Sequence, residues 1–199
     1  QKLIDYQLVV KMTETEILRT VEACIRRDPR AEKALFECFA PRVFGLARRY
    51  APDETAAQDF LQECFVVIFD NLKKYDARRG DFGGWLYRVS INTCLQLLRK
   101  ARQQPLLDFG DVPATADTIE ADDLTLIPES LLLEGIRQLP PGYRQVLNLA
   151  VFEEWPHRDI AAALGITESA SRSQLVRAKQ FLKNFITKTL PRYEPQRLV

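Results

Sequence analysis

The chain has 199 residues, of which 46% are hydrophobic, and its formal net charge is only +1. This length accommodates one large or two small domains, and the near-neutral total argues against a protein that binds nucleic acid freely through bulk charge. A single histidine excludes a histidine-rich metal site. No apolar run reaches the roughly 18 residues of a membrane span, and no signal peptide is recognised. We therefore expect a cytoplasmic protein without membrane insertion.

The charge is unevenly distributed along the chain. Residues 1–102 carry a net charge of +4, residues 103–130 carry −7 with no basic residue, and residues 131–199 carry +4. This pattern predicts two basic bodies joined by an acidic connector. The widely spaced cysteines predict reduced thiols packed in helices rather than disulfides or a metal site. These cysteines are Cys24, Cys38, Cys64 and Cys94.

Helical periodicity dominates, and no alternating run bounded by turn residues predicts a strand. We therefore expect an all-α protein. Thr13 and Glu16 have the spacing of a capping box, which predicts where the first helix begins. The helices expected along the chain are residues 14–27, 30–50, 54–72, 82–101, 131–138, 142–152, 157–164 and 167–187.

Prolines and acidic residues give the middle of the chain a linker composition. Its scattered apolar residues predict that it docks on the protein rather than floating. We therefore expect two helical domains, an N-terminal bundle and a C-terminal helix-turn-helix, joined by an acidic linker. The expected divisions are an extension with the first helix (1–29), the bundle (30–102), the linker (103–130), the helix-turn-helix domain (131–190) and a tail (191–199).

The helix expected over 54–72 carries one narrow polar strip on an otherwise apolar surface. At 100° per residue, Asp59, Gln62, Glu63 and Asp70 fall within about 100° of arc, together with Val66. The strip is either the solvated face of a core helix or a docking site. Carboxylates and an amide around one apolar side chain have the anatomy of an interface. A docking strip of this charge would require a basic partner.

The next segment, residues 73–102, carries a net charge of +6 and alternates aromatic with basic side chains. Basic side chains neutralise phosphates and aromatic rings stack on unpaired bases, so the segment predicts binding to single-stranded nucleic acid. Alternatively, its aromatic residues belong to the core and its basic residues only solvate a face. The candidate contact residues are Lys74, Tyr75, Arg78, Arg79, Phe82, Trp85, Arg88, Asn92 and Arg99.

Residues 157–182 have the pattern of a helix-turn-helix, with Gly165 at the turn and Thr167 able to cap the second helix. The second helix has a basic face of short side chains that suits a major groove. An ordinary helical hairpin with a solvated face is the alternative. We interpret His157 as a surface or capping residue rather than a ligand. The candidate DNA contacts are Arg172, Ser173, Val176, Arg177 and Lys179.

Taken together, these motifs resemble those of bacterial RNA polymerase sigma factors of the extracytoplasmic function group, in the sigma-70 family. "DFLQECFVVIF" is similar to the family's D-x-x-Q-E-x-F helix, and "FGGWLYRVSIN" to its F-x-x-W-L segment. The stretch from "LPPGYR" to "VRAK" is similar to the family's second domain. The resemblance covers roughly residues 30–102, as a region 2-like domain, and 131–187, as a region 4-like domain.

The resemblance implies a function for each surface. Asp59, Gln62, Glu63 and Val66 would contact the β′ clamp helices of core polymerase. The basic aromatic segment would recognise and help melt the −10 element, and the helix-turn-helix would recognise the −35 element. Further implied partners are the polymerase β flap and an anti-sigma factor. Active protein would associate with the nucleoid. Independently of the resemblance, we infer from the charge of the acidic linker that it mimics nucleic acid.

Two residues depart from the family pattern. Pro156 stands where serine or threonine is common, and Ser171 where a β-branched residue is common. The resemblance therefore does not imply which −35 sequence is recognised.

A stand-alone helix-turn-helix regulator is the alternative function, and such a protein would bind duplex DNA tightly without polymerase. No nucleophile–base pair, metal cluster or glycine-rich phosphate loop indicates an enzyme. We therefore expect no catalytic residues, metal or cofactor.

Overall fold

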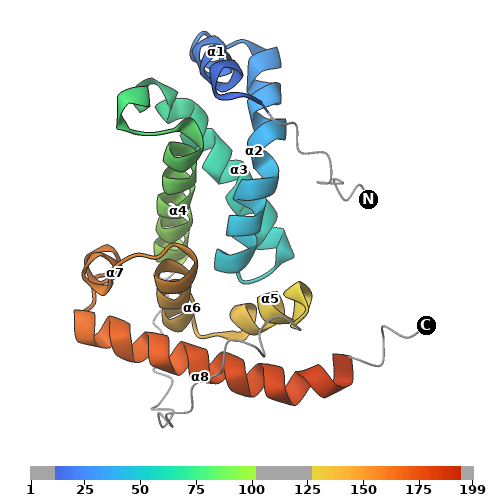
Figure 1. The fold of residues 1–199 in the computed structure, drawn as a ribbon, viewed down its shortest axis with the longest axis vertical. Helices are drawn as coiled ribbons and strands as arrows, with labels where there is room; N and C mark the ends of the chain where they lie inside the picture. The colour runs from blue at the N-terminus through green and yellow to red at the C-terminus, as the bar shows by residue number, and fades with distance from the viewer. Residues whose placement is uncertain (1–11, 102–126, 194–199) are drawn as a thin grey trace. The chain divides into compact units, whose positions relative to one another are not determined.

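A computed structural model describes residues 12–101 and 127–193 of the chain (Figure 1). Every regular element in these two ranges is helical, and the chain divides into two compact units between Pro105 and Leu106. The predicted fold class, all-α with two helical domains, is confirmed. The predicted extension before residue 12, most of the acidic linker and the end of the tail lie outside the described residues.

The first unit is built from four long helices with two short 3₁₀ turns between the third and fourth. All four of these helices begin at a side chain that caps a free backbone N–H group, and the cap of α4 is Asp81. Thr13 and Glu16 form the predicted capping box, and Asp28 and Asp53 accept from Arg30 N and Ala56 N respectively. The elements are α1 (Glu14–Ile25), α2 (Pro29–Tyr50), α3 (Glu54–Asn71), η1 (Leu72–Lys74), η2 (Ala77–Arg79) and α4 (Phe82–Ala101).

The core of this unit lies where α2, α3 and α4 pack together, while α1 packs against α2 (Figure 1). Leu46, Ile68 and Leu86, one from each of the three helices, are fully buried. Cys64 of α3 and Cys94 of α4 meet in this core as free thiols, with their sulfur atoms 3.9 Å apart. The predicted placement of these cysteines in packed helices is confirmed.

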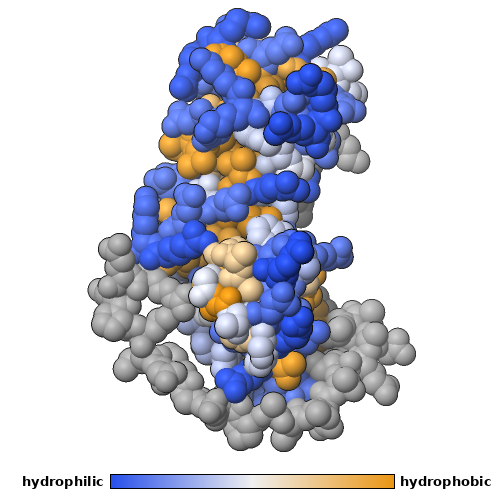
Figure 2. Space-filling model, turned by 90° about the vertical axis from the view of Figure 1, so that its left-hand side faces the viewer, coloured by the Kyte–Doolittle hydropathy of each residue, from blue (hydrophilic) through white to orange (hydrophobic). Residues whose placement is uncertain are grey.

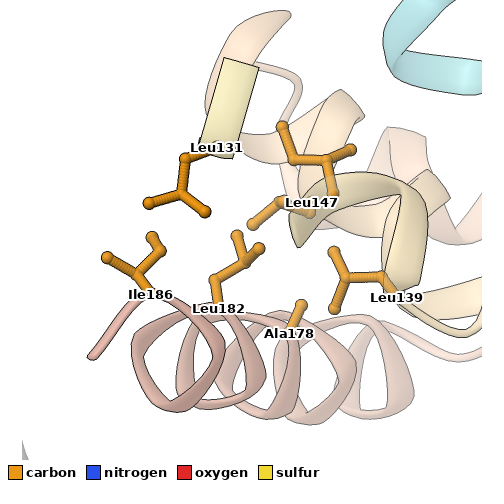
Figure 3. Packing of buried hydrophobic residues seen from close by; sticks show 7 residues of the cluster. Leu131, Leu139, Leu147, Ala178, Leu182 and Ile186 are labelled. Carbon is orange, nitrogen blue, oxygen red and sulfur yellow. The ribbon is translucent and has the colours of Figure 1, made fainter. Parts of the chain in front are cut away.

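In the second unit, the shorter helices pack against one long final helix. Its hydrophobic core forms where α5 and α6 meet α8, and Figure 3 shows Leu131 and Leu147 pointing toward Ala178, Leu182 and Ile186. The elements are α5 (Glu129–Gln138), α6 (Pro141–Leu147), the π-helical turn η4 (Asn148–Phe152), α7 (His157–Leu164) and α8 (Glu168–Tyr193).

A buried arginine closes the turn between α5 and α6. The Arg144 guanidinium donates to the carbonyl oxygens of Arg137, at 2.7 Å, and Leu139, at 3.1 Å. These carbonyls lie at the end of α5, where no further helical turn can satisfy them. Burial lowers the pKa of Arg144, and the neighbouring Arg137 charge lowers it further. Arg144, the last residue of the "LPPGYR" stretch, is therefore a structural cap.

The prediction of one continuous α-helix over 142–152 is wrong after Leu147. The α-helical pattern ends at Leu147, and the chain continues as a π turn in which Glu153 N donates to Asn148 O at 3.1 Å. Asn148 is fully buried. Because a π turn spaces the donor and acceptor residues five positions apart, rather than the four of an α-helix, the side chains after Asn148 are rotated relative to a continuous α-helix.

Close packing of α5 on α8 requires glycine at position 135. A Cβ atom at Gly135 would lie 2.9 Å from Phe185 Cδ1 and 3.0 Å from Leu182 Cδ2. We expect Gly135→Ala to destabilise this unit by roughly 1–3 kcal/mol, because overpacking forces side chains out of place. Thermal unfolding followed by circular dichroism measures the effect as a lower Tm.

Gly142→Ala is the matched control for this substitution. A Cβ at Gly142 would meet only the flexible amide of Gln174, 3.3 Å away. The Tm of Gly142→Ala should therefore fall much less than the Tm of Gly135→Ala. Equal Tm values for Gly135→Ala and the unaltered protein would contradict the packing argument.

Candidate functional site

The polar strip on α3 faces solvent. We call Asp59, Gln62, Glu63, Val66 and Asp70 the acidic surface, and all five are exposed. Val66 is 55% exposed at its centre, whereas Leu61, Phe65 and Ile68 of the same helix are buried in the core. The structure therefore brings together every residue of the predicted docking strip.

The acidic surface is only partly neutralised by its own chain. Arg27 approaches Asp70, with 3.6 Å between Nη2 and Oδ1. Arg27 is held there by a left-handed backbone (φ 62°) at the corner between α1 and α2. Among the described residues, neither Asp59 nor Glu63 forms an ion pair. The part of the acidic surface formed by Asp59 and Glu63 therefore presents uncompensated negative charge beside the exposed Val66.

The second surface lies on the loop before α4 and on α4 itself, and we call it the basic aromatic surface. Rings of Tyr75, Phe82 and Trp85 pack against one another, with centroids 5.2 to 5.6 Å apart. Phe82 also packs edge-on against Phe39 of α2, at 5.4 Å. These contacts attach the loop to the helical core.

Burial corrects one of the predicted contact residues. Phe82 is only 3% exposed, because α2 and the other two rings enclose it. It is therefore a packing residue that cannot offer its face to a base. Tyr75 and Trp85 are half-buried, while Lys74, Arg78 and Arg79 are exposed. Arg88, Asn92 and Arg99 are also exposed, along one side of α4.

Figure 2 views the protein from the side where α4 lies in Figure 1, and hydrophilic side chains there surround smaller hydrophobic areas.

Tyr75 helps to hold the loop before α4 in place, because its hydroxyl donates to Gly80 O at 3.2 Å. Burial raises the pKa of this hydroxyl, and Asp81 adds to the effect, so Tyr75 remains a donor. Asp81 also accepts from Gly84 N at 2.8 Å, which caps the first turn of α4.

Two loop arginines already have a counter-ion. Asp76 accepts from both Nε and Nη2 of Arg78 at 3.0 Å, and Arg79 Nε lies 3.8 Å from its carboxylate. The hydrogen bonds from Arg78 hold the pKa of Asp76 below its ordinary value. A phosphate that binds Arg78 in the same bidentate manner must therefore displace Asp76.

The third surface is the helix-turn-helix formed by α7 and α8. Gly165 adopts the left-handed conformation (φ 69°) at the turn, and Thr167 Oγ1 accepts from Ala170 N at 3.1 Å. Both local predictions are confirmed. On α8, Arg172, Ser173, Val176 and Lys179 are exposed and Arg177 is half-buried. Arg172 forms an ion pair with Glu168 one turn earlier, at 2.7 Å.

A polar contact between the two helices was not predicted. His157 Nδ1 lies 2.8 Å from Ser171 Oγ, and Ser171 is fully buried. The bond joins the start of α7 to the inner side of α8. A serine among the apolar positions of α8, with one histidine able to reach it, was the available signal.

Residues 12–101 and 127–193 offer neither a metal-binding cluster nor a membrane-spanning helix. No group of three or more His, Cys, Asp and Glu side chains in those ranges could hold a metal ion. None of the described helices is long and apolar enough to cross a membrane.

Comparisons with known proteins assign both units. The family described as Sigma-70 region 2 matches residues 35–104, and Sigma-70, region 4 matches residues 130–182. The RNA polymerase sigma-H factor of Pseudomonas aeruginosa is 30% identical over 182 residues, which cover 85% of this chain and 93% of that protein. The ECF RNA polymerase sigma factor SigE of Mycolicibacterium smegmatis is 28% identical over 158 residues, covering 75% of this chain and 59% of the relative.

Among solved structures, the chain is similar to the sigma factor RpoE in a co-crystal with the anti-sigma factor NepR from Bartonella quintana. The similarity has a TM-score of 0.48 at 15% identity and covers 78% of this chain and 96% of that one.

The ion pairs that Asp76 forms with Arg78 and Arg79 allow a test of the basic aromatic surface. Asp76→Asn should raise affinity for single-stranded oligo(dT) about two- to five-fold, because it frees Arg78 and Arg79 from an exposed ion pair. Fluorescence anisotropy at 50 mM KCl measures the change. Asp59→Asn removes the same charge from the acidic surface and should leave the affinity nearly unaltered. An equal gain in both variants would mean that only total charge matters.

Proposed function

The chain belongs to the extracytoplasmic function group of the sigma-70 family, and on that premise we propose that it directs RNA polymerase to promoters through three surfaces. A sigma factor confers promoter-specific initiation on core polymerase. The observation that carries this function is the presence of region 2 and region 4 in order along one chain, over residues 35–104 and 130–182. The three surfaces divide between these regions.

The acidic surface is the proposed core polymerase contact. Its exposed Val66 is surrounded by the polar groups of Asp59, Gln62 and Glu63. An apolar centre with a charged rim suits a basic, helical partner such as the β′ clamp helices. Because Asp59 and Glu63 have no ion pair within the described residues, binding would not first have to break one at these two positions.

The basic aromatic surface is the proposed site for the −10 element. Bases exposed by melting could stack on Trp85 and Tyr75, while Arg88 and Asn92 of α4 contact phosphates or base edges. The loop arginines add charge once a phosphate replaces Asp76. Packing of Phe82 against α2 supports this assignment because it fixes the stacking rings before DNA arrives.

The helix-turn-helix is the proposed −35 reader. Val176 is 51% exposed between the polar side chains of α8, where it can touch a thymine methyl group. Arg172, Ser173, Arg177 and Lys179 surround it and can donate to bases or phosphates. Region 4 would also contact the polymerase β flap, as the resemblance implies.

Further parts of the proposal concern the cellular context. The protein would act in the cytoplasm, associate with the nucleoid when active, and be held inactive by an anti-sigma factor. It would have no catalytic activity of its own, because the polymerase performs the chemistry. A stand-alone helix-turn-helix regulator is less favoured, since that function leaves the region 2 unit without a role.

In vitro transcription tests the function directly. Purified bacterial core polymerase and genomic promoter fragments are incubated with and without the protein, and 5′ ends of the transcripts are mapped. Discrete start sites that depend on the protein are expected. Tight, specific duplex binding by the protein alone, without initiation, would instead indicate the helix-turn-helix regulator.

Charge reversal on the acidic surface should abolish core binding. Glu63→Lys places a cation where a basic partner is expected, while its exposed position leaves the core unchanged. Fluorescence titration with core polymerase measures the affinity, and circular dichroism verifies the fold. Glu22→Lys, an exposed reversal on α1 outside the strip, is the matched control and should bind normally. Unaltered affinity of Glu63→Lys would remove the docking assignment.

Removal of one α8 side chain tests −35 recognition. Arg177→Ala should weaken holoenzyme binding to a −35-containing promoter by about 1–3 kcal/mol if the guanidinium contacts a base. Lys188→Ala, exposed further along the same helix, should have little effect. A loss that is uniform across promoter sequences would reassign Arg177 to a phosphate contact.

A further inference from the structure

Two arginines of α2 are organised by one tyrosine of α4. The Arg42 guanidinium lies over the Tyr87 ring, 4.7 Å from its centroid, and Arg49 Nη2 donates to the Tyr87 hydroxyl at 2.8 Å. Positions 42 and 49 are seven residues apart, so they lie about two turns apart on the same side of the helix. Neither arginine was predicted to have a function.

No described residue neutralises the charge of Arg42 through an ion pair. Arg48, on the same helix, pairs with Glu54 at 3.3 Å. Arg42 is exposed and forms no ion pair with any described residue. Its cation contacts the face of the Tyr87 ring rather than a hydrogen-bond acceptor, so its N–H groups remain able to bind another ligand.

Arg42 lies next to the basic aromatic surface. A Cβ atom at Gly83, in the first turn of α4, would be 3.2 Å from Arg42 Nη1 and 3.1 Å from Asp81 Oδ1. The absence of a side chain at this glycine therefore lets the guanidinium approach the start of α4. One turn earlier on α2, Phe39 packs against Phe82 of the ring cluster. The cation thus lies where α2, the loop and α4 meet.

We propose that Arg42 binds a backbone phosphate of the DNA strand held by the basic aromatic surface, and that Tyr87 positions its guanidinium. The inference rests on the proposed function, because that function supplies the strand. A guanidinium fork matches two phosphate oxygens and needs to be held at a fixed angle to do so. The cation–π contact with Tyr87 would restrict that angle. The nucleic-acid surface then extends from α4 onto α2.

Salt dependence of binding provides the test. The full chain is titrated against fluorescein-labelled, 20-nucleotide oligo(dT) by anisotropy, in KCl from 25 to 200 mM. Each lost phosphate contact on a single strand should make the slope of log K against log[KCl] shallower by about 0.7. We expect this change for Arg42→Gln. Arg48→Gln, the matched control with a neutralised cation, should keep the slope of the unaltered protein.

An unchanged slope in Arg42→Gln overturns the phosphate contact, as does a failure of the unaltered chain to bind at 25 mM KCl. Tyr87 is tested by two variants. Tyr87→Phe keeps the ring and should keep the slope, whereas Tyr87→Leu should behave like Arg42→Gln. If Tyr87→Leu fails to fold, Arg42→Lys decides: it should keep the slope but bind a few-fold more weakly, and full affinity would overturn the positioning role.

Failure of this inference is distinguishable from failure of the proposed function. Transcription by the unaltered protein with core polymerase, combined with an unchanged slope in Arg42→Gln, would overturn only the Arg42 contact. A shallower slope without any initiation would support the phosphate contact and overturn the sigma function.

Discussion

Enclosure of α3 by its neighbours is the constraint on which the first unit depends. Side chains from α2 and α4 cover most of this helix, so only one narrow arc of it can remain in solvent. That arc carries carboxylates around Val66. Because the rest of α3 is fixed in the core, the acidic surface is rigid before a partner arrives, and binding would cost little conformational entropy there.

The same core supports the loop that precedes α4. Phe82 joins the ring cluster to Phe39, and Asp81 caps the helix, so the loop is attached at its end rather than free. In the second unit, Arg144 performs a comparable task by closing the α5–α6 turn. Each unit thus uses buried or capping groups to present exposed polar side chains on helices or short loops. Because the exposed polar side chains are not the groups that hold the fold together, they could be substituted without loss of the fold.

Features that depend on neighbours in sequence could be predicted from the sequence. Caps at Thr13 and Thr167, the turn at Gly165 and the exposed arc of α3 follow from local chemistry and helical period. Contacts between distant segments could not be predicted. Periodicity does not distinguish Phe82, which is buried, from the half-exposed Trp85. Nor does it indicate that Tyr87 reaches Arg42 and Arg49, since that contact requires the packing of α2 on α4.

The bond between His157 and Ser171 has a consequence for how DNA preference can change over evolution. It lies on the inner side of α8, opposite the residues proposed to face DNA, and so helps to set the rotation of α8 about its own axis. A larger apolar side chain at position 171 would remove the bond and turn every outward residue together. Sequence preference could therefore drift through substitutions hidden in the core, while the side chains proposed to touch bases stay the same.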